Sequence, residues 1–219
     1  MNRILLSASA AIALCAIPAA AETEFGGVMR AVNQTTDTGG EYYTDFGLHV
    51  GGDAGRFFAL RENRESSVGW GNSFGNSWVG VSYNITTDVT KIAAKHDINE
   101  FSFGGEAKTN DEWNVWARYE NDTYLVGAKY NQNDVVGILA GYKSNGLKAV
   151  AEVKSNDEWS IGLGYEQGDY SVYAGYEWDE DYKFEANYKL TENFTLQGAY
   201  VLEDAGATER VKAGISFAF

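Results

Sequence analysis

Hydrophobic residues alternate with polar or small ones along most of the chain, most clearly at its C-terminus. In the last ten residues, RVKAGISFAF, the apolar positions are Val211, Ala213, Ile215, Phe217 and Phe219. A side-chain period of two is typical of a β-strand with one apolar face. A final aromatic residue is typical of a strand whose outward face meets lipid and whose last ring lies at the membrane interface. The pattern predicts a strand that closes a membrane-spanning barrel.

The same alternation recurs upstream, with small aliphatic residues in mid-strand and Tyr, Trp or Phe at many strand ends. These predicted strands start at Phe101, Trp113, Tyr124, Val136, Leu147, Trp159, Tyr170, Tyr182 and Phe194. Two aromatic girdles around an apolar band are typical of transmembrane β-barrels. The connections are short and rich in Asn, Asp, Gly and Ser, which favour turns. Only the connection Val201–Glu209 is predicted to be longer.

The first third of the chain is less regular. Its predicted strands are Phe25–Gln34, Tyr42–Gly51, Arg56–Glu62, Ser66–Gly71 and Ser77–Asn84. In the third of these, we expect Phe58 and Leu60 to face outward. Val89–Asp97 is either a weak strand or a short helical loop folded into the lumen. Bacterial barrels have an even number of strands, so we predict an all-β, transmembrane, antiparallel up-and-down barrel of sixteen strands, with fourteen or twelve as alternatives.

A soluble β-sandwich is the main alternative fold, because its strands also alternate. Its core would favour Leu, Ile and Val in mid-strand, where this chain has Ala and Gly. The 25 Gly and single Pro suit many strands joined by tight turns. Beyond the N-terminal segment, no run reaches the roughly 18 apolar residues of a membrane helix, so a membrane protein of this sequence must be a barrel. Composition does not shift along 22–219, which predicts one barrel domain there.

Residues 1–21 have the features of a cleaved signal peptide. Arg3 is followed by the apolar stretch Ile4–Ile17, Pro18, and a cleavage site at Ala19–Ala21. A membrane anchor is disfavoured by the short apolar run, and a lipoprotein at Cys15 by the Leu before it. Cys15 is the only cysteine and leaves with the signal, so the mature chain has no thiol for a disulfide or a thiolate metal site. We expect no metal and no cofactor.

Strand parity predicts charged side chains on the inner face. The predicted pore-lining residues are Arg30, Asp45, His49, Arg61, Glu106, Arg118, Lys129, Lys148, Glu152, Lys183, Glu185 and Lys212. On the lipid face, an Arg or Lys at the membrane midplane would cost about 2–4 kcal/mol, so these groups need water. They predict a wet lumen, and the alternative is that they pair and plug a narrower barrel.

The charge balance indicates which ions the channel favours. The formal net charge is −14, and −15 once Arg3 is removed. Such an acidic chain is a poor nucleic-acid binder, and its field favours cations near its mouths. The inner wall leans basic, but the predicted external rim is acidic, with Asp111, Glu112, Asp157, Glu158, Asp179, Glu180, Asp181, Glu203, Asp204 and Glu209. We expect a weak preference for cations.

Ser66–Tyr83 resembles a hairpin of the Gram-negative general porins, through Val68-Gly69-Trp70 and Phe74-Gly75. Asp45–Leu60, with its Asp53-Ala54-Gly55 turn, is similar to the preceding porin hairpin. The resemblance implies a water-filled channel in the bacterial outer membrane for passive diffusion of small hydrophilic solutes and ions.

The resemblance also implies partners. The final strand is similar to the porin signature that the barrel assembly machinery reads, with Phe217 and Phe219 as the assembly signal. Outer-membrane lipid would surround the barrel, and the general porins usually form homotrimers. Those porins carry extended external loops and a large third loop that narrows the pore, whereas all loops predicted here are short.

Two other functions remain open from the sequence. A structural or adhesive barrel with a plugged lumen would show the same strand pattern. A barrel hydrolase would need a Ser–His pair with an orienting polar group. The chain has only His49 and His96 and no G-x-S-x-G signature, so we expect no enzymatic activity.

Overall fold

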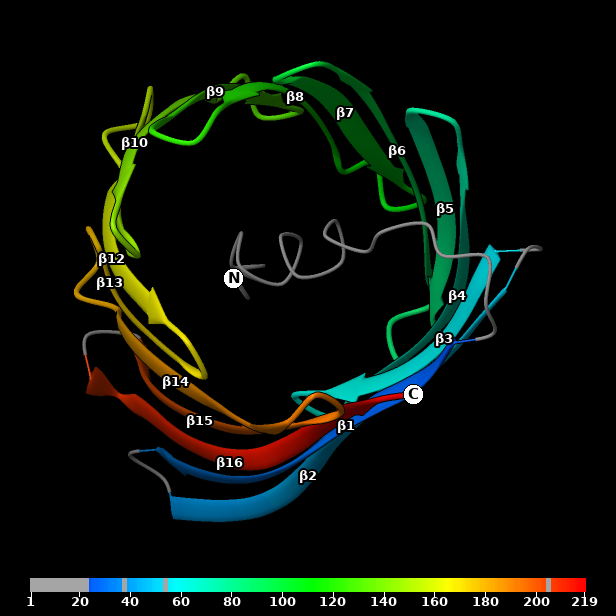
Figure 1. Cartoon of the computed structure of the whole chain (residues 1–219), viewed down its shortest axis with the longest axis vertical. Helices are drawn as coiled ribbons and strands as arrows, with labels where there is room; N and C mark the ends of the chain where they lie inside the picture. Colours follow the sequence, from blue (N-terminus) through cyan, green and yellow to red (C-terminus); the bar gives the residue numbers. More distant parts are fainter. Residues whose placement is uncertain (1–23, 37–38, 53–54, 204–205) are drawn as a thin grey trace.

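The computed structural model describes residues 24–36, 39–52, 55–203 and 206–219, and these form a closed all-β barrel of sixteen antiparallel strands (Figure 1). The predicted signal peptide lies outside the described residues. The strands are β1 (Glu24–Thr36), β2 (Gly39–Gly52), β3 (Gly55–Glu62), β4 (Glu65–Phe74), β5 (Ser77–Asn84), β6 (Val89–Ile98), β7 (Phe101–Lys108), β8 (Trp113–Glu120), β9 (Tyr124–Asn131), β10 (Val136–Ser144), β11 (Leu147–Lys154), β12 (Trp159–Gln167), β13 (Tyr170–Glu177), β14 (Tyr182–Thr191), β15 (Phe194–Glu203) and β16 (Thr208–Ala218).

The strand count confirms the sixteen-strand prediction, because the ambiguous segment is a strand. Residues 89–98 form β6 and pair with β5 and β7 along their length. The prediction of a long connection at Val201–Glu209 is wrong, because β15 extends to Glu203 and β16 begins at Thr208. The hairpin register there continues to the pair Glu203↔Thr208.

The barrel closes where its first and last strands meet. β1 pairs with β16 from Gly26↔Ala218 to Thr36↔Thr208. The Phe25 N–H donates to the Phe219 carbonyl at 2.9 Å, and the Phe219 N–H donates to the Phe25 carbonyl at 2.7 Å. Closure leaves no unpaired strand edge, which is the condition for strands to cross hydrocarbon.

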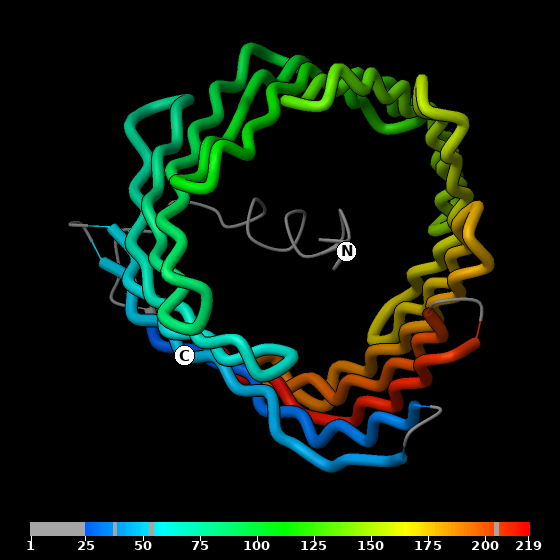
Figure 2. Tube along the Cα trace, turned by 180° about the vertical axis from the view of Figure 1, so that it is seen from behind, coloured from blue at the N-terminus to red at the C-terminus, as the bar shows by residue number. Residues whose placement is uncertain are grey.

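The two ends of the barrel carry short turns (Figure 2). We call the end where β1 begins and β16 ends the terminal rim, and the other end the opposite rim. Asn and Asp occupy the left-handed region in many turns, as at Asp111, Asp157 and Asn145, with φ of 64°, 67° and 49°. These two residue types tolerate that region because their short side chains hydrogen-bond locally.

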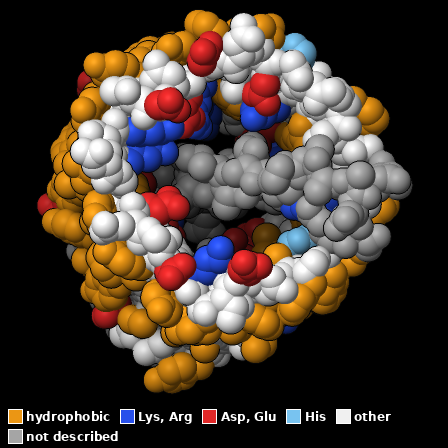
Figure 3. Space-filling view, viewed as in Figure 1, with side chains coloured by type: hydrophobic (Ala, Val, Ile, Leu, Met, Phe, Trp, Pro, Cys, Tyr) orange, Lys and Arg blue, Asp and Glu red, His pale blue; other side chains and the backbone are white. Residues whose placement is uncertain are grey.

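The outer face of the barrel is apolar (Figure 3). Val126, Ile161 and Leu163 are 51%, 51% and 58% exposed in mid-strand. Aromatic pairs lie toward both rims: Phe101–Tyr119 and Tyr124–Tyr142 at the terminal rim, and Trp113–Tyr130 and Trp159–Tyr176 at the opposite rim, with centroids 5.0 to 5.9 Å apart. No helix in the described ranges is long and apolar enough to cross a membrane.

The inside of the barrel is not a packed hydrophobic core. Among the described residues, only Val32 and Leu125 are buried large apolar side chains. The backbone ladder therefore holds the strands together, and the wall leaves polar side chains facing one another across the lumen.

Candidate pore

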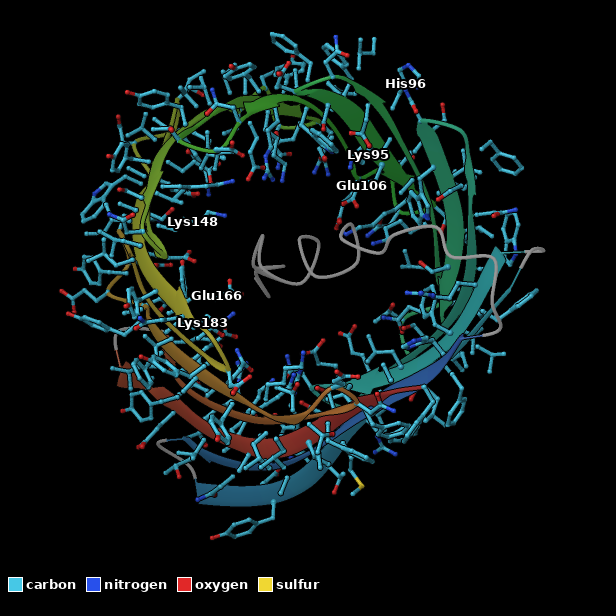
Figure 4. The ribbon with its side chains drawn as sticks, viewed as in Figure 1. Lys95, His96, Glu106, Lys148, Glu166 and Lys183 are labelled. Carbon is cyan, nitrogen blue, oxygen red and sulfur yellow. The ribbon has the colours of Figure 1, made fainter. Side chains whose placement is uncertain are left out.

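The inner face of the wall is set by strand pairing. Lys95, Glu106, Lys148, Glu166 and Lys183 point into the lumen, and His96 points away from it (Figure 4). Directly opposed residues share a face and successive residues alternate. The pairing register therefore carries the inward orientation from strand to strand around the whole barrel.

Eleven of the twelve predicted pore-lining residues lie on this inner face, and Arg61 does not. The residues on the inner face are Arg30, Asp45, His49, Glu106, Arg118, Lys129, Lys148, Glu152, Lys183, Glu185 and Lys212.

The placement of Arg61 and the parity of β3 need correction. Arg61 is opposite Phe46, which is 43% exposed on the outer face. Phe57, which is 58% exposed, faces outward instead of the predicted Phe58 and Leu60. The sequence FFALRE has apolar residues at four successive positions, so it does not fix the parity. Arg61 lies near the opposite rim, where a long side chain can reach water from the outer face.

A buried polar network crosses the seam between β1 and β16. Lys212 Nζ lies 3.2 Å from Asp45 Oδ2, 3.1 Å from Asn63 Oδ1 and 3.7 Å from Glu62 Oε1. Asp45 and Lys212 are 2% and 9% exposed. Arg30 extends the network, with Nη1 3.6 Å from Glu62 Oε1 and Nε donating to Gln197 Oε1 at 3.0 Å. The network ties four strands, β1, β2, β15 and β16, to the end of β3.

A second cluster on the inner wall, toward the terminal rim, carries excess positive charge. Arg118 and Lys143 both form ion pairs with Glu120. Lys148 on β11 lies directly opposite Lys143 on β10. It is close enough to Arg118 and Lys143 for both cations to repel it. Three cations thus share one carboxylate in this part of the lumen wall.

Other charges pair along the wall while remaining partly exposed. Lys95 Nζ lies 2.9 Å from Asp97 Oδ2, and Lys183 Nζ lies 2.8 Å from Glu185 Oε1. The Lys183 and Glu185 side chains are 25% and 38% exposed. Such exposure on an inward face indicates solvent between the side chains, in contrast to a tightly paired plug. Figure 3 shows charged side chains around the inner margin of the mouth.

Large aromatic side chains on the inner face lie flat against glycines, which the sequence pattern did not reveal. The Tyr173 ring covers Gly162 and Gly175, with its hydroxyl 2.5 and 2.9 Å from where a Cβ would stand. Trp78 and Trp116 cover other glycines in the same way. Glycine at these positions lets each ring lie along the wall, which keeps it from projecting far into the lumen.

The connections that the structure describes are too short to fold across the lumen. The turn between β5 and β6 is residues 85–88, and the others between described strands are similarly short. At the opposite rim these turns are acidic, with Asp88, Asp111, Glu112, Asp134, Asp157, Glu158, Asp179, Glu180 and Asp181. Within that rim, Lys108 Nζ donates to Glu112 Oε2 at 2.5 Å, which holds the pKa of the Glu112 carboxyl below its usual value. Asp204 lies outside the described residues.

The two histidines lie on opposite faces of the wall. His49 is opposite Gly26 and Phe58 on the inner face. His96 is on the outer face, where its Nδ1 is 2.8 Å from Ser77 Oγ. The ring that meets a serine hydroxyl is therefore outside the lumen, away from the charged wall. In the described part of the chain, no group of three His, Cys, Asp or Glu could hold a metal ion.

Comparison with solved structures connects this barrel to known ones. No family model matches the chain, and no curated protein sequence matches it. A triple mutant of Rhodopseudomonas blastica porin superposes with a TM-score of 0.63 at 14% identity, covering 90% of this chain and 100% of that one. Another mutant of Rh. blastica porin gives 0.66 at 13% identity, with the same coverage. The fold is that of a porin. At this identity the porin fold is shared although little of the sequence is, which agrees with a fold specified by alternation rather than by particular residues.

Proposed function

We propose that the chain is a short member of the general porins and forms a water-filled diffusion channel in the bacterial outer membrane. The observation that carries the proposal is a closed sixteen-stranded barrel with an apolar outer face and a charged, partly exposed inner face. In a barrel of this strand number the lumen is wide enough to hold water. Small hydrophilic solutes and ions pass by diffusion, and no catalytic step is required of the wall.

The partners of the channel are part of the same proposal. The signal peptide at 1–21 directs export, outer-membrane lipid surrounds the apolar face, and the assembly machinery reads the last strand through Phe217 and Phe219. The mature porin forms a homotrimer, as the resemblance to general porins implies. The side-chain arrangement at the C-terminus supports the role of the last strand as an assembly signal, because Phe219 packs against Phe194 and Phe217 at 5.5 and 6.1 Å between ring centroids.

Liposome swelling tests whether the channel passes uncharged solutes. Vesicles that contain the refolded chain 22–219 are diluted into isosmotic sugars of increasing size. We expect rapid swelling with arabinose and slower swelling with larger sugars, because a wide wet lumen sieves by size. Vesicles that swell no faster than protein-free ones, although the barrel is folded, would favour a plugged structural barrel.

The ion preference of the channel follows from charge on the rim and on the wall. The wall cations mostly have carboxylate partners, while the opposite rim holds an excess of carboxylates. We expect a weak preference for K⁺ over Cl⁻, strongest at low salt because exposed rim charges are screened beyond about 8 Å at physiological ionic strength. The reversal potential across a planar bilayer in a KCl gradient measures it, and an anion-selective value would contradict the expectation.

A further inference from the structure

One oblique row of inner-face residues contains two directly opposed pairs of an indole and an amine. Trp78 on β5 is directly opposite Lys95 on β6, and Trp116 on β8 is directly opposite Lys129 on β9. Gly104 on β7 joins the two pairs, since it is opposite both Lys95 and Trp116. In order around the wall, the row is Ser73, Trp78, Lys95, Gly104, Trp116, Lys129, Gly137 and Lys154.

The row crosses the lumen wall from one mouth to the other. Ser73 is the second-last residue of β4, which ends at the terminal rim, and Lys154 is the last residue of β11, which ends at the opposite rim. Trp116 and Lys129 lie between these ends. A solute that passes through the barrel can therefore meet this pair without leaving the lumen.

The indoles present a flat face toward the lumen. A Cβ on Gly104 would stand 2.4 Å from the ring of Trp116, and a Cβ on Gly80 would stand 2.5 Å from the ring of Trp78. The Trp116 ring thus lies over a glycine of the neighbouring strand β7, and the Trp78 ring lies over Gly80 of its own strand. Both tryptophans remain partly exposed, so the ring face away from the glycine is open to lumen water.

Lys129, directly opposite Trp116, supplies a positive charge that has no ion-pair partner among the described residues. Lys95 pairs with Asp97 at 2.9 Å, and Lys154 pairs with Glu158 at 2.8 Å. Lys129 is exposed and has no ion pair or hydrogen bond with any residue in the described part of the chain. Directly opposed residues have Cβ atoms about 4.5–5.5 Å apart, so this amine and the Trp116 ring can contact one small molecule together.

We propose that Trp116 and Lys129 form a binding site in the lumen for solutes that carry a carboxylate on an aromatic ring. The solute ring stacks on the open face of the indole, and the carboxylate accepts a charge-assisted hydrogen bond from Lys129 Nζ. Gly104 lies beneath the Trp116 ring and lets the indole lie along the wall, which keeps its lumen face free for the solute. The inference rests on the proposed diffusion channel and names a class of solute that it retains.

The test separates the ring from the charge. Benzoate, acetate and benzamide are added in turn to the refolded channel in a planar bilayer, and the half-blocking concentration of each is measured. We expect the value for benzoate to be about five-fold lower than for acetate, which lacks the aromatic contact, and about five-fold lower than for benzamide, which lacks the ion pair. Trp116→Ala and Lys129→Gln should each raise the benzoate value about five-fold.

Two control variants isolate the site. Trp113→Ala removes an indole of the same strand from the outer face and should leave the benzoate value unchanged. Lys148→Gln removes an inner-wall cation from a different row, so it should shift ion selectivity but keep the difference between benzoate and acetate. Equal half-blocking concentrations of benzoate and acetate in a conducting channel would overturn the site. A Trp116→Ala channel that benzoate blocks at the same concentration as the parent would overturn it too.

A second readout does not depend on conductance. Benzoate should quench the tryptophan fluorescence of the folded barrel, and the saturable part of that quenching should be lost in Trp116→Ala but kept in Trp113→Ala. A barrel that carries no current would overturn the proposed channel, and the fluorescence titration would still decide for or against the binding site. Saturable quenching that persists in Trp116→Ala would contradict the site.

Discussion

Replacing Lys212 by methionine is expected to lower the free energy of unfolding of the barrel by about 3–5 kcal/mol, the cost of leaving a buried charge without its partner. Asp45 is 3% exposed at its side chain and has Lys212 as its cation at 3.2 Å. The remaining bond to Asp45 from the Asn63 backbone N–H, at 2.9 Å, does not neutralise the carboxylate. Urea titration of the refolded barrel in lipid vesicles, followed by tryptophan fluorescence, measures the loss.

Two matched variants test whether the loss comes from the orphaned charge. The double variant Lys212→Met with Asp45→Leu should recover most of the stability, because replacing both partners of a buried pair by apolar groups is often neutral. Lys183→Met breaks a partly exposed pair on the same inner face and should cost only about 1 kcal/mol or less. A Lys212→Met barrel as stable as the parent would show that the seam network does not hold β1 against β16.

Deleting Phe219 is expected to reduce the amount of barrel in the outer membrane by about tenfold or more. A tenfold reduction corresponds to a loss of roughly 1.4 kcal/mol in the free energy that favours assembly of the closing strand. The deletion removes both backbone hydrogen bonds to Phe25 and the ring contacts with Phe194 and Phe217. It also removes the aromatic end of the strand that we propose the assembly machinery reads. Heat-modifiable migration of membrane fractions on gels measures the folded barrel.

The conservative variant distinguishes the ring from chain length. Phe219→Trp keeps an aromatic ring and both backbone bonds, so it should assemble normally, while Phe219→Ser keeps the backbone bonds alone. Normal assembly of the deletion would contradict both the proposed signal and the structural role of the closing pair. A defect in the deletion but not in Phe219→Ser would assign the effect to the backbone bonds.

Alternation, together with the aromatic strand ends, the terminal Phe and the signal peptide, was enough to predict the barrel, its sixteen strands and the face on which most charged residues lie. Where large apolar residues alternate strictly with polar or small ones, as in β12, parity follows from the sequence, because a one-residue slip would put the apolar set into water. In β3 four apolar residues are consecutive, and the sequence could not assign Arg61 to a face. The pairing of Arg61 with Phe46 on β2 places Arg61 on the outer face, and this pairing is visible only in the structure.

The contacts across the lumen wall could not be predicted in this way. Trp116 and Lys129 are 13 positions apart, and only the register of β8 against β9 makes them direct neighbours. The seam network likewise joins Asp45 to Lys212, which are 167 positions apart. Strand register depends on turn lengths and on the stagger needed for closure, so it becomes visible only when the barrel is assembled. Parity alone places Trp116 and Tyr173 on the inner face, but only the structure shows the glycines beneath their rings.

Single-channel recording of the refolded chain 22–219 in a planar bilayer tests the central claim most directly. An open, water-filled lumen predicts discrete, long-lived conductance steps that grow in proportion to bulk salt conductivity. Trp113→Ala, which changes only the outer face, should give steps of the same size. A folded barrel that inserts but gives no steps would contradict the account and would identify the chain as a closed, structural barrel.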